Sequence, residues 1–305
     1  MKVVVSPTAP ALSGPAVRQR LTDYAELTKP RIATMVLVTV AAGYLLAAGT
    51  GARLLPLIHT LIGTTLVAGA ASAWNMWLER VSDARMRRTA NRPLPSGRLH
   101  HLEVVVFGTA LAVTGVNYLY HAVGLMPAVV AALTFVTYVA VYTPLKPLTE
   151  WNTHVGAIPG ALPPVIGASA ATGTVGWDAV VLFAVILFWQ LPHFMAIAWM
   201  YRKDYGQAGM RMIPVADPTG AKTSRSMIAW CVVLIAASLL PLALRPVDWV
   251  YLVGALALGA YFLKSTFRFR ADRSERQARQ VLKASILYLP GIMGLLLIHG
   301  LVTGR

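Results

Sequence analysis

Charged side chains are scarce in this sequence, and acidic ones are the scarcest. Of the 305 residues, 13% are charged and 56% are hydrophobic, with 12 acidic residues against 27 Lys and Arg. This composition is too apolar for an ordinary soluble globular protein and indicates a chain that crosses a membrane several times. We therefore expect an all-α integral membrane fold.

The chain has a single cysteine, Cys231, which lies inside an apolar run. One cysteine excludes a disulfide framework and a cysteine-based metal site. The first twenty residues, MKVVVSPTAPALSGPAVRQR, also lack a continuous apolar core, so they do not resemble a cleaved signal peptide. We expect residues 1–25 to form a flexible cytoplasmic tail and residues 26–305 to form one intramembrane domain.

Nine apolar segments are long enough to cross a bilayer, which takes about 20 helical residues. They centre roughly on residues 33–50, 55–76, 103–122, 125–142, 155–172, 178–199, 226–244, 248–264 and 284–301. The sequence therefore predicts nine transmembrane helices.

The distribution of positive charge supports this count and gives it an orientation. With nine spans and a cytoplasmic N-terminus, 24 of the 27 basic residues fall on the cytoplasmic side, leaving only Arg53, Arg245 and Arg305 outside. Lys and Arg concentrate in the cytoplasmic loops of membrane proteins. We expect integration into the inner or plasma membrane, and the net charge of +15 needs no nucleic-acid partner.

Polar residues gather in two cytoplasmic loops, which follow the second and sixth predicted spans. In the first, Asn75, Glu79 and Asp83 recur every four residues, so their oxygens line one stripe of a helix. Hard oxygen ligands on one face are typical of a Mg²⁺ site completed by substrate phosphate. Arginines that suit phosphate oxygens follow: Arg85, Arg87, Arg88 and Arg92. A polar helix end with arginines at the membrane edge is the structural alternative.

The second loop carries Arg202, Lys203 and Asp204 directly after the sixth span. Asp204 could bind a second ion or hold Lys203, and the two basic residues could bind a distal phosphate; an ion pair at a helix end explains them equally well. Lys146 is the only basic residue between the fourth and fifth spans and is a further candidate diphosphate ligand. Because both loops follow helices of the same direction, we expect them to close over one cavity.

Several phrases together resemble the protoheme IX farnesyltransferases, or haem O synthases, within the UbiA-type intramembrane prenyltransferases. They are ELTKPRI at 26–32, NMWLERVSDARMRRTANRPLPSGRL at 75–99, YTPLK at 142–146, NTHVGAIPGALPPVIG at 152–167 and FWQLPHFMAIAWMYRKDYGQAGMRMIP at 188–214. The resemblance implies a nine-helix UbiA-type bundle. It also implies that farnesyl diphosphate prenylates the 2-vinyl group of haem b, with addition of water, to give haem O and diphosphate for a terminal oxidase.

The resemblance also assigns roles to residues. Asn75, Glu79 and Asp83 fall on the first acidic motif, with Mg²⁺ as the cofactor, Arg88 and Arg92 on its basic tail, and Asp204 on the second acidic motif. Related enzymes often carry another acid four residues after Asp204, where this chain has Ala208. For haem, His193 is the candidate ligand and His154 a poorer one, while Lys29 and Arg31 could meet propionates or anchor the membrane edge.

Two other functions remain open from the sequence. A different prenyl acceptor, such as a quinone precursor or a chlorophyllide, would need the same diphosphate chemistry, although MRRTANRP and LPHF favour the haem branch. A transporter would place its ionisable groups near the bilayer midplane, whereas most acids here fall at loop edges. Besides its substrates and membrane lipid, a haem A synthase is the candidate partner.

Overall fold

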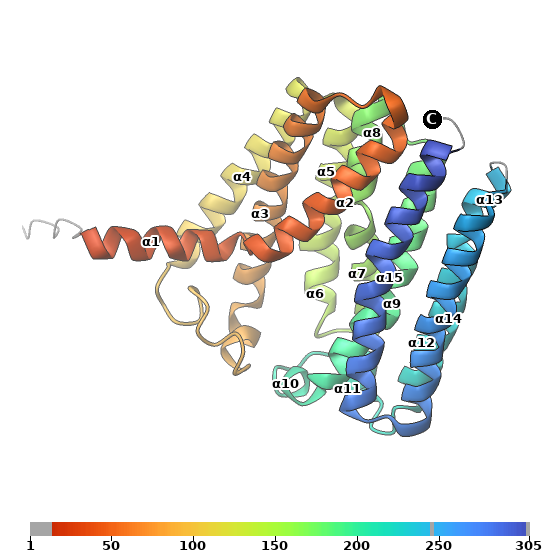
Figure 1. The fold of residues 1–305 in the computed structure, drawn as a ribbon. Coiled ribbons are helices and arrows are strands. Elements are labelled where there is room, and N and C mark those ends of the chain that lie inside the picture. The colour runs from red at the N-terminus through yellow and green to blue at the C-terminus, as the bar shows by residue number, and fades with distance from the viewer. Residues whose placement is uncertain (1–13, 245–246, 303–305) are drawn as a thin grey trace, which may run out of the picture.

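The computed structural model describes residues 14–244 and 247–302, and every regular element within them is a helix. Nine helical segments of this described part are long and apolar enough to cross a membrane. They stand side by side as one bundle in Figure 1. The all-α class and the nine predicted spans are therefore confirmed.

Five spans are unbroken helices and four are composite. The unbroken ones are α3 (Leu54–Ala84), α4 (His101–Ala122), α9 (Trp177–Met200), α14 (Trp249–Asp272) and α15 (Glu275–Val302). The composite ones are α2 (Pro30–Ala48) with the 3-10 turn η1 (Gly49–Gly51), α5 (Leu125–Val136) with the π-helix η2 (Thr137–Tyr142) and α6 (Thr143–Leu145), α7 (Asn152–Ala161) with α8 (Pro163–Thr172), and α12 (Ala221–Ser238) with α13 (Leu240–Leu244).

Three short helices lie outside the spans. They are α1 (Gly14–Leu27), α10 (Arg202–Gln207) and α11 (Ile213–Ala216). In Figure 1, α10 and α11 lie at the lower end of the bundle, together with the long loop between α3 and α4. This end, which we call the site end, carries both loops that the sequence singled out.

The N-terminal segment differs from its expected boundary. We expected a flexible tail through residue 25, but residues from Gly14 onward form α1, and Leu27 at its end is fully buried. Ion pairs tie this helix down, because Arg98 donates to Asp23 at 2.8 Å and Arg20 to Glu103 at 2.7 Å. These contacts lie far from α1 in the sequence, so its own composition could not reveal them. Residues 1–13 lie outside the described part.

The last two spans also extend further than their apolar runs. We expected helices over 248–264 and 284–301, whereas α14 continues to Asp272 and α15 begins at Glu275. Hydropathy marks only the part of a helix that lies in hydrocarbon. Arg268, Arg270, Arg276 and Arg279 of this connection therefore lie on helices, and Arg273 lies in the short turn between them.

Glycine allows α2 and α8 to approach backbone to backbone. A Cβ atom on Gly167 would lie 1.9 Å from the Val40 carbonyl oxygen, and one on Gly43 would lie 2.1 Å from the Pro164 carbonyl oxygen. Small residues permit such contacts between membrane helices. Pro163, which lacks an N–H group, begins α8 and separates it from α7.

Gly167→Ala should destabilise the bundle by about 1–3 kcal/mol, because the added methyl group forces two backbones apart. The measurement is the midpoint of thermal unfolding of the purified protein in detergent. Gly294→Ala on α15 is the matched control, since nothing lies within 4 Å of its added Cβ atom. Equal midpoints for the two variants would contradict the close α2–α8 contact.

Candidate active site

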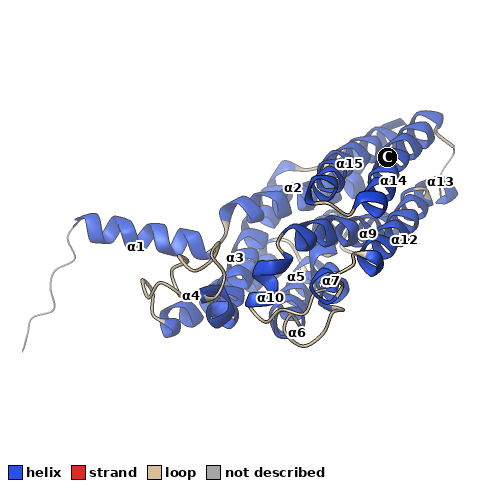
Figure 2. Ribbon diagram, turned by 90° about the horizontal axis from the view of Figure 1, so that it is seen from below, coloured by secondary structure: helices blue, strands red, loops and turns tan. Residues whose placement is uncertain are grey.

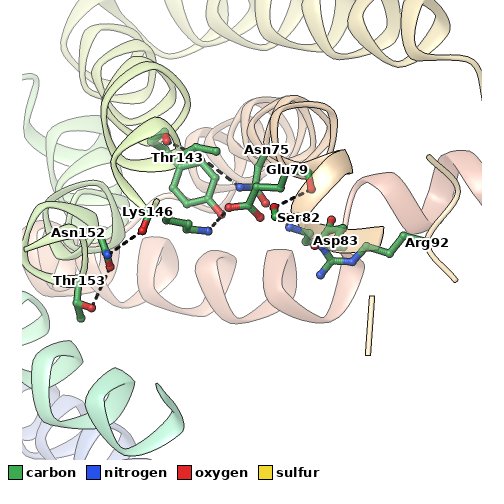
Figure 3. Close-up of polar contacts among 11 residues, drawn as sticks. Asn75, Glu79, Ser82, Asp83, Arg92, Thr143, Lys146, Asn152 and Thr153 are labelled. Atoms are coloured by element: carbon green, nitrogen blue, oxygen red, sulfur yellow. Dashed lines mark hydrogen bonds and ion pairs between the residues drawn. The ribbon is translucent and has the colours of Figure 1, made fainter. Parts of the chain in front are cut away.

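Three oxygen acceptors on α3 form the centre of the site. Asn75, Glu79 and Asp83 occupy successive turns at the site end of this helix, and all three are buried. Figure 3 shows them on one side of α3, facing side chains from other segments. The predicted stripe is therefore confirmed. We call these three residues the acceptor stripe.

Each acceptor receives a hydrogen bond from a different cation. Lys29 Nζ donates to Asn75 Oδ1 at 2.7 Å, and Arg92 Nη1 donates to Asp83 Oδ2 at 2.6 Å. The third is Lys146, whose Nζ donates to Glu79 Oε1 at 2.5 Å. Because a buried carboxylate is costly without a partner, these cations make the stripe tolerable at the membrane edge.

Lys29 reaches the stripe from the junction of α1 and α2. It has φ +48° and ψ +62°, a left-handed conformation that costs a lysine about 1–2 kcal/mol. Burial, with Arg92 nearby, lowers the pKa of Lys29 to about 7. We expected Lys29 only as a propionate contact or a membrane anchor. Its place in the Thr-Lys-Pro sequence, just before a helix begins, was the available signal.

Lys146 is presented by the π-helix η2 and the single turn α6. The Nζ atom lies 4.6 Å from the ring centre of Tyr142. Although burial acts in the opposite direction, Tyr142 and Glu79 raise the pKa of Lys146 above its ordinary value. A Cβ atom on Gly156 would lie 2.4 Å from the Tyr142 ring, so only glycine leaves room for that ring. π-Helical turns frequently occur at functional sites.

Thr143 connects η2 to the acceptor stripe. Asn75 Nδ2 donates to Thr143 Oγ1 at 3.3 Å, and Thr143 Oγ1 donates to the Tyr138 carbonyl at 2.8 Å. The second bond spans five residues, as the wider turn of the π-helix requires. Thr143 and Tyr142 were missed from the sequence because both lie within an apolar run.

One carboxylate oxygen of the stripe accepts no hydrogen bond. Asp83 Oδ1 is buried and has no hydrogen-bond partner, while its Oδ2 atom pairs with Arg92. Buried polar atoms of this kind call for an unseen partner such as an ion or water. Together with the Glu79 carboxylate and the Asn75 amide, it supplies the oxygen donors that Mg²⁺ prefers. The residues present therefore fit a divalent cation.

The two loops expected to meet are in contact. Met86 of the first loop packs in one buried cluster with residues of the second, among them Ala208 and Met210. The Arg88 guanidinium lies 5.7 Å from the ring centre of Tyr201. Figure 2, seen from the site end, shows α10 between α3 and α7 in projection. The contact between the loops is confirmed.

The side-chain amide of Asn152 and the backbone N–H of Arg211 join the second loop to the Lys146 segment. Asn152 Nδ2 donates to the Arg211 carbonyl at 2.6 Å and to the Lys146 carbonyl at 3.3 Å. Arg211 N also donates to the Lys146 carbonyl at 2.9 Å. The position of Lys146 therefore depends on Arg211, which lies 65 positions further along the chain.

The charged residues of α10 do not all reach the stripe. Arg202 donates to the Trp199 carbonyl at 2.6 Å and lies 3.7 Å from Glu275, and Lys203 is exposed. Asp204 is partly buried in the first turn of α10. Among the described residues, no three His, Cys, Asp or Glu side chains gather as a metal site. The structure thus leaves Asp204 apart from the two stripe carboxylates.

Tyr205 is the residue of α10 that approaches the stripe. Burial raises the pKa of Tyr205, and the charges of Arg88 and Lys146 act on it in the opposite direction. The phenol packs against the buried cluster that joins the two loops. The sequence did not single out Tyr205, because the charged residues before it were the more obvious candidates.

His193 lies between α9 and α15 in a defined tautomer. Its Nδ1 atom lies 2.7 Å from Ser285 Oγ, and that hydroxyl donates to the Leu282 carbonyl at 2.7 Å. Nδ1–H must then be the donor to Ser285, which leaves the lone pair on Nε2. The ring stacks on Trp189 with centroids 4.6 Å apart. A metal-binding histidine is commonly oriented by such a hydrogen bond.

The other candidate haem contacts are less well placed. Arg31 is exposed in the first turn of α2. His154 Nε2 accepts from Trp230 Nε1 at 3.1 Å, so that nitrogen is already occupied. The structure therefore favours His193 over His154 as a group free to bind iron.

Comparison with known proteins places this chain in a family. Residues 36–288 match the UbiA prenyltransferase family. Curated relatives include the protoheme IX farnesyltransferases of Solibacter usitatus, 46% identical over 90% of this chain and 98% of the relative, and of Salinibacter ruber, 44% identical over 91% and 98%.

Solved structures show the same fold at low identity. A structure described for digeranylgeranylglyceryl phosphate synthase has a TM-score of 0.79 at 15% identity, covering 93% of this chain and 99% of its own. A UbiA homologue from Archaeoglobus fulgidus bound to GPP and Mg²⁺ has a TM-score of 0.68 at 15% identity, covering 90% and 99%. With a family match over most of its length, this chain belongs to the UbiA prenyltransferase family.

Proposed function

We propose that this protein transfers the farnesyl group of farnesyl diphosphate to the 2-vinyl group of haem b, yielding haem O and diphosphate. The observation that carries the proposal is the acceptor stripe with its three cations and the unpaired Asp83 oxygen. Oxygen donors for a metal and cations for phosphate lie there at the end of an apolar bundle. The relatives named protoheme IX farnesyltransferase supply the acceptor.

Asn75, Glu79 and Asp83 would hold Mg²⁺, which a related structure contains alongside a prenyl diphosphate. When bound, the ion neutralises charge on the diphosphate and makes it a better leaving group. Asp204, on the other side of the loop contact, is the candidate for a second ion. Its separation from the stripe in the described structure favours two ions joined by the substrate over one shared ion.

Lys146, Arg92 and Lys29 are the groups that meet the diphosphate oxygens. Each is already directed at the stripe, so a diphosphate bound there receives their hydrogen bonds in place of the two carboxylates and the Asn75 amide oxygen. Donors of this kind stabilise the negative charge that develops as the carbon–oxygen bond breaks. Arg88 and Lys203 lie on the two loops beyond this centre and are the candidates for the distal phosphate.

The vinyl group supplies the electron pair for the new bond. Its terminal carbon bonds to C1 of the farnesyl chain as the diphosphate departs with the electrons of the C1–O bond. Water then adds to the remaining cationic carbon and loses a proton, giving the hydroxyl group. The apolar bundle holds the chain and the porphyrin away from bulk water until that step.

On the haem side, His193 Nε2 is the proposed iron ligand and Arg31 a proposed propionate contact. The tautomer set by Ser285 leaves the required lone pair on Nε2. Arg31 begins α2 at the same junction as Lys29, where an exposed guanidinium can reach a carboxylate at the membrane edge.

We place the site at the cytoplasmic face of the inner or plasma membrane, with the N-terminus on the same side. The support is the charge asymmetry of the sequence, because 24 of the 27 basic residues fall in the cytoplasmic segments in this arrangement. A haem A synthase is the proposed recipient of the product.

The reaction can be tested directly by incubating detergent-purified protein with haem b, farnesyl diphosphate and Mg²⁺. We expect haem O, detected by mass spectrometry, in the complete mixture and none with EDTA or without protein. Prenylation of another acceptor instead of haem b would keep the diphosphate site but overturn the acceptor. Folded protein that prenylates no acceptor would contradict the proposal, and substrate flux in vesicles would then favour a transporter.

Asp83→Asn should lower kcat by about a hundredfold or more, because it removes a metal-binding charge needed in the transition state. Size-exclusion profiles should show that the variant remains folded. The matched control is Asp272→Asn, the same chemical change at an exposed residue of the α14–α15 turn. Full activity of Asp83→Asn would remove the metal role from the stripe.

His193→Ala should weaken haem binding more than diphosphate binding, because it removes the proposed iron ligand. The measurement is a titration of haem absorption, alongside the KM for farnesyl diphosphate. His59→Ala serves as the control, since that histidine bonds Tyr118 near the start of α3, at the opposite end of the bundle. An unchanged haem titration would assign His193 to packing alone.

A further inference from the structure

One side of α1 is packed against the bundle. The ring of Tyr24 meets that of Phe107 edge to face at 5.0 Å, Arg20 pairs with Glu103 at 2.7 Å, and Leu27 is fully buried. Glu103 and Phe107 belong to the first two turns of α4. These contacts fix α1 across the site end of that span. Figures 1 and 2 both show α1 running out sideways from the bundle, across the direction of the spans.

A second side of α1 is apolar and uncovered. Val17 is 42% exposed, Leu21 is 67% exposed, and Ala25 is exposed as well. Residues four apart lie on one helical face, so the three form a continuous stripe. We call them the apolar stripe of α1. Nothing in the described chain covers it.

The third side is polar. Arg18 and Thr22 each follow a stripe residue by one position and are exposed. One residue turns an α-helix by 100°, so Arg18 points well away from Val17, and Thr22 points well away from Leu21. Alpha-helix α1 therefore has three faces, one for the bundle, one apolar and one polar.

The level of α1 relative to the membrane follows from its connection to α2. Lys29, two residues after α1 ends, donates to Asn75, which belongs to the spanning segment Leu54–Ala84. Past this junction the exposed apolar side chains continue on α2, where Ile32 is 60% and Met35 is 63% exposed within a membrane span. The apolar stripe of α1 thus lies next to a surface that lipid covers.

We propose that α1 lies in the interface of the bilayer at the site end, with Val17, Leu21 and Ala25 toward the acyl chains and Arg18 and Thr22 toward water. The partner of this surface is therefore lipid. Amphipathic helices in membrane interfaces bury their apolar face in this way. Because Lys29 lies only two residues after the end of α1, the bilayer then helps to position the cation that contacts Asn75.

The test uses nitroxide labels on the full-length protein in liposomes of phosphatidylcholine and phosphatidylglycerol. Cys231, which is fully buried, is first replaced by alanine (Cys231→Ala), so that each introduced cysteine is the one that carries the label. Leu21→Cys and Thr22→Cys are labelled as one matched pair, and Val17→Cys and Arg18→Cys as another. Accessibility to oxygen, which concentrates in the acyl region, is compared with accessibility to a water-soluble nickel complex.

We expect labels at positions 17 and 21 to be more accessible to oxygen and less to nickel than their neighbours at 18 and 22. High nickel accessibility at all four positions would place α1 in water and overturn the proposal. Low accessibility to both reagents at 17 and 21 would mean that protein, such as a second copy of the chain, covers the stripe, and this too would overturn it. The readout does not depend on catalytic activity.

Discussion

The burial of two carboxylates at the edge of an apolar bundle is the constraint that organises this structure. Charge is costly in such a place unless it is paired, and the chain has only 12 acidic residues. Glu79 and Asp83 are therefore met by Lys146 and Arg92 at hydrogen-bonding distance, and Asn75 is met by Lys29. The same pairing that makes the acids tolerable gathers the cations a diphosphate requires.

Satisfying this constraint draws distant segments together. Lys29 adopts a left-handed backbone conformation where it contacts the stripe. The π-helix η2 presents Lys146, and the absence of a Cβ atom at Gly156 leaves room for the Tyr142 ring beside that lysine. The Lys146 segment is in turn fastened to the second loop by Asn152. The geometry of the site thus depends on contacts between segments, and those of Lys29 and Lys146 use uncommon backbone conformations.

Periodicity and charge were enough to predict the nine spans and the acceptor stripe, because both depend on spacing along one helix. Tyr142 and Thr143 could not be found this way, since they lie in an apolar run. Only the π-helix brings them next to Lys146 and Asn75. Arg202 was a candidate both for the diphosphate and for an ion pair at a helix end, and the structure directs it to Trp199 and Glu275. The partner of a long side chain depends on tertiary packing, which spacing does not reveal.

The pairing of Glu79 with Lys146 also has a consequence for the order in which the protein is made. The two residues are 67 positions apart, so the ribosome completes Glu79 well before its cation emerges. Asn152 and Arg211, which hold the Lys146 segment, come later still. During synthesis Glu79 is therefore made before its hydrogen-bonding lysine, and the site is completed only when the sixth span and the loop after it have been inserted.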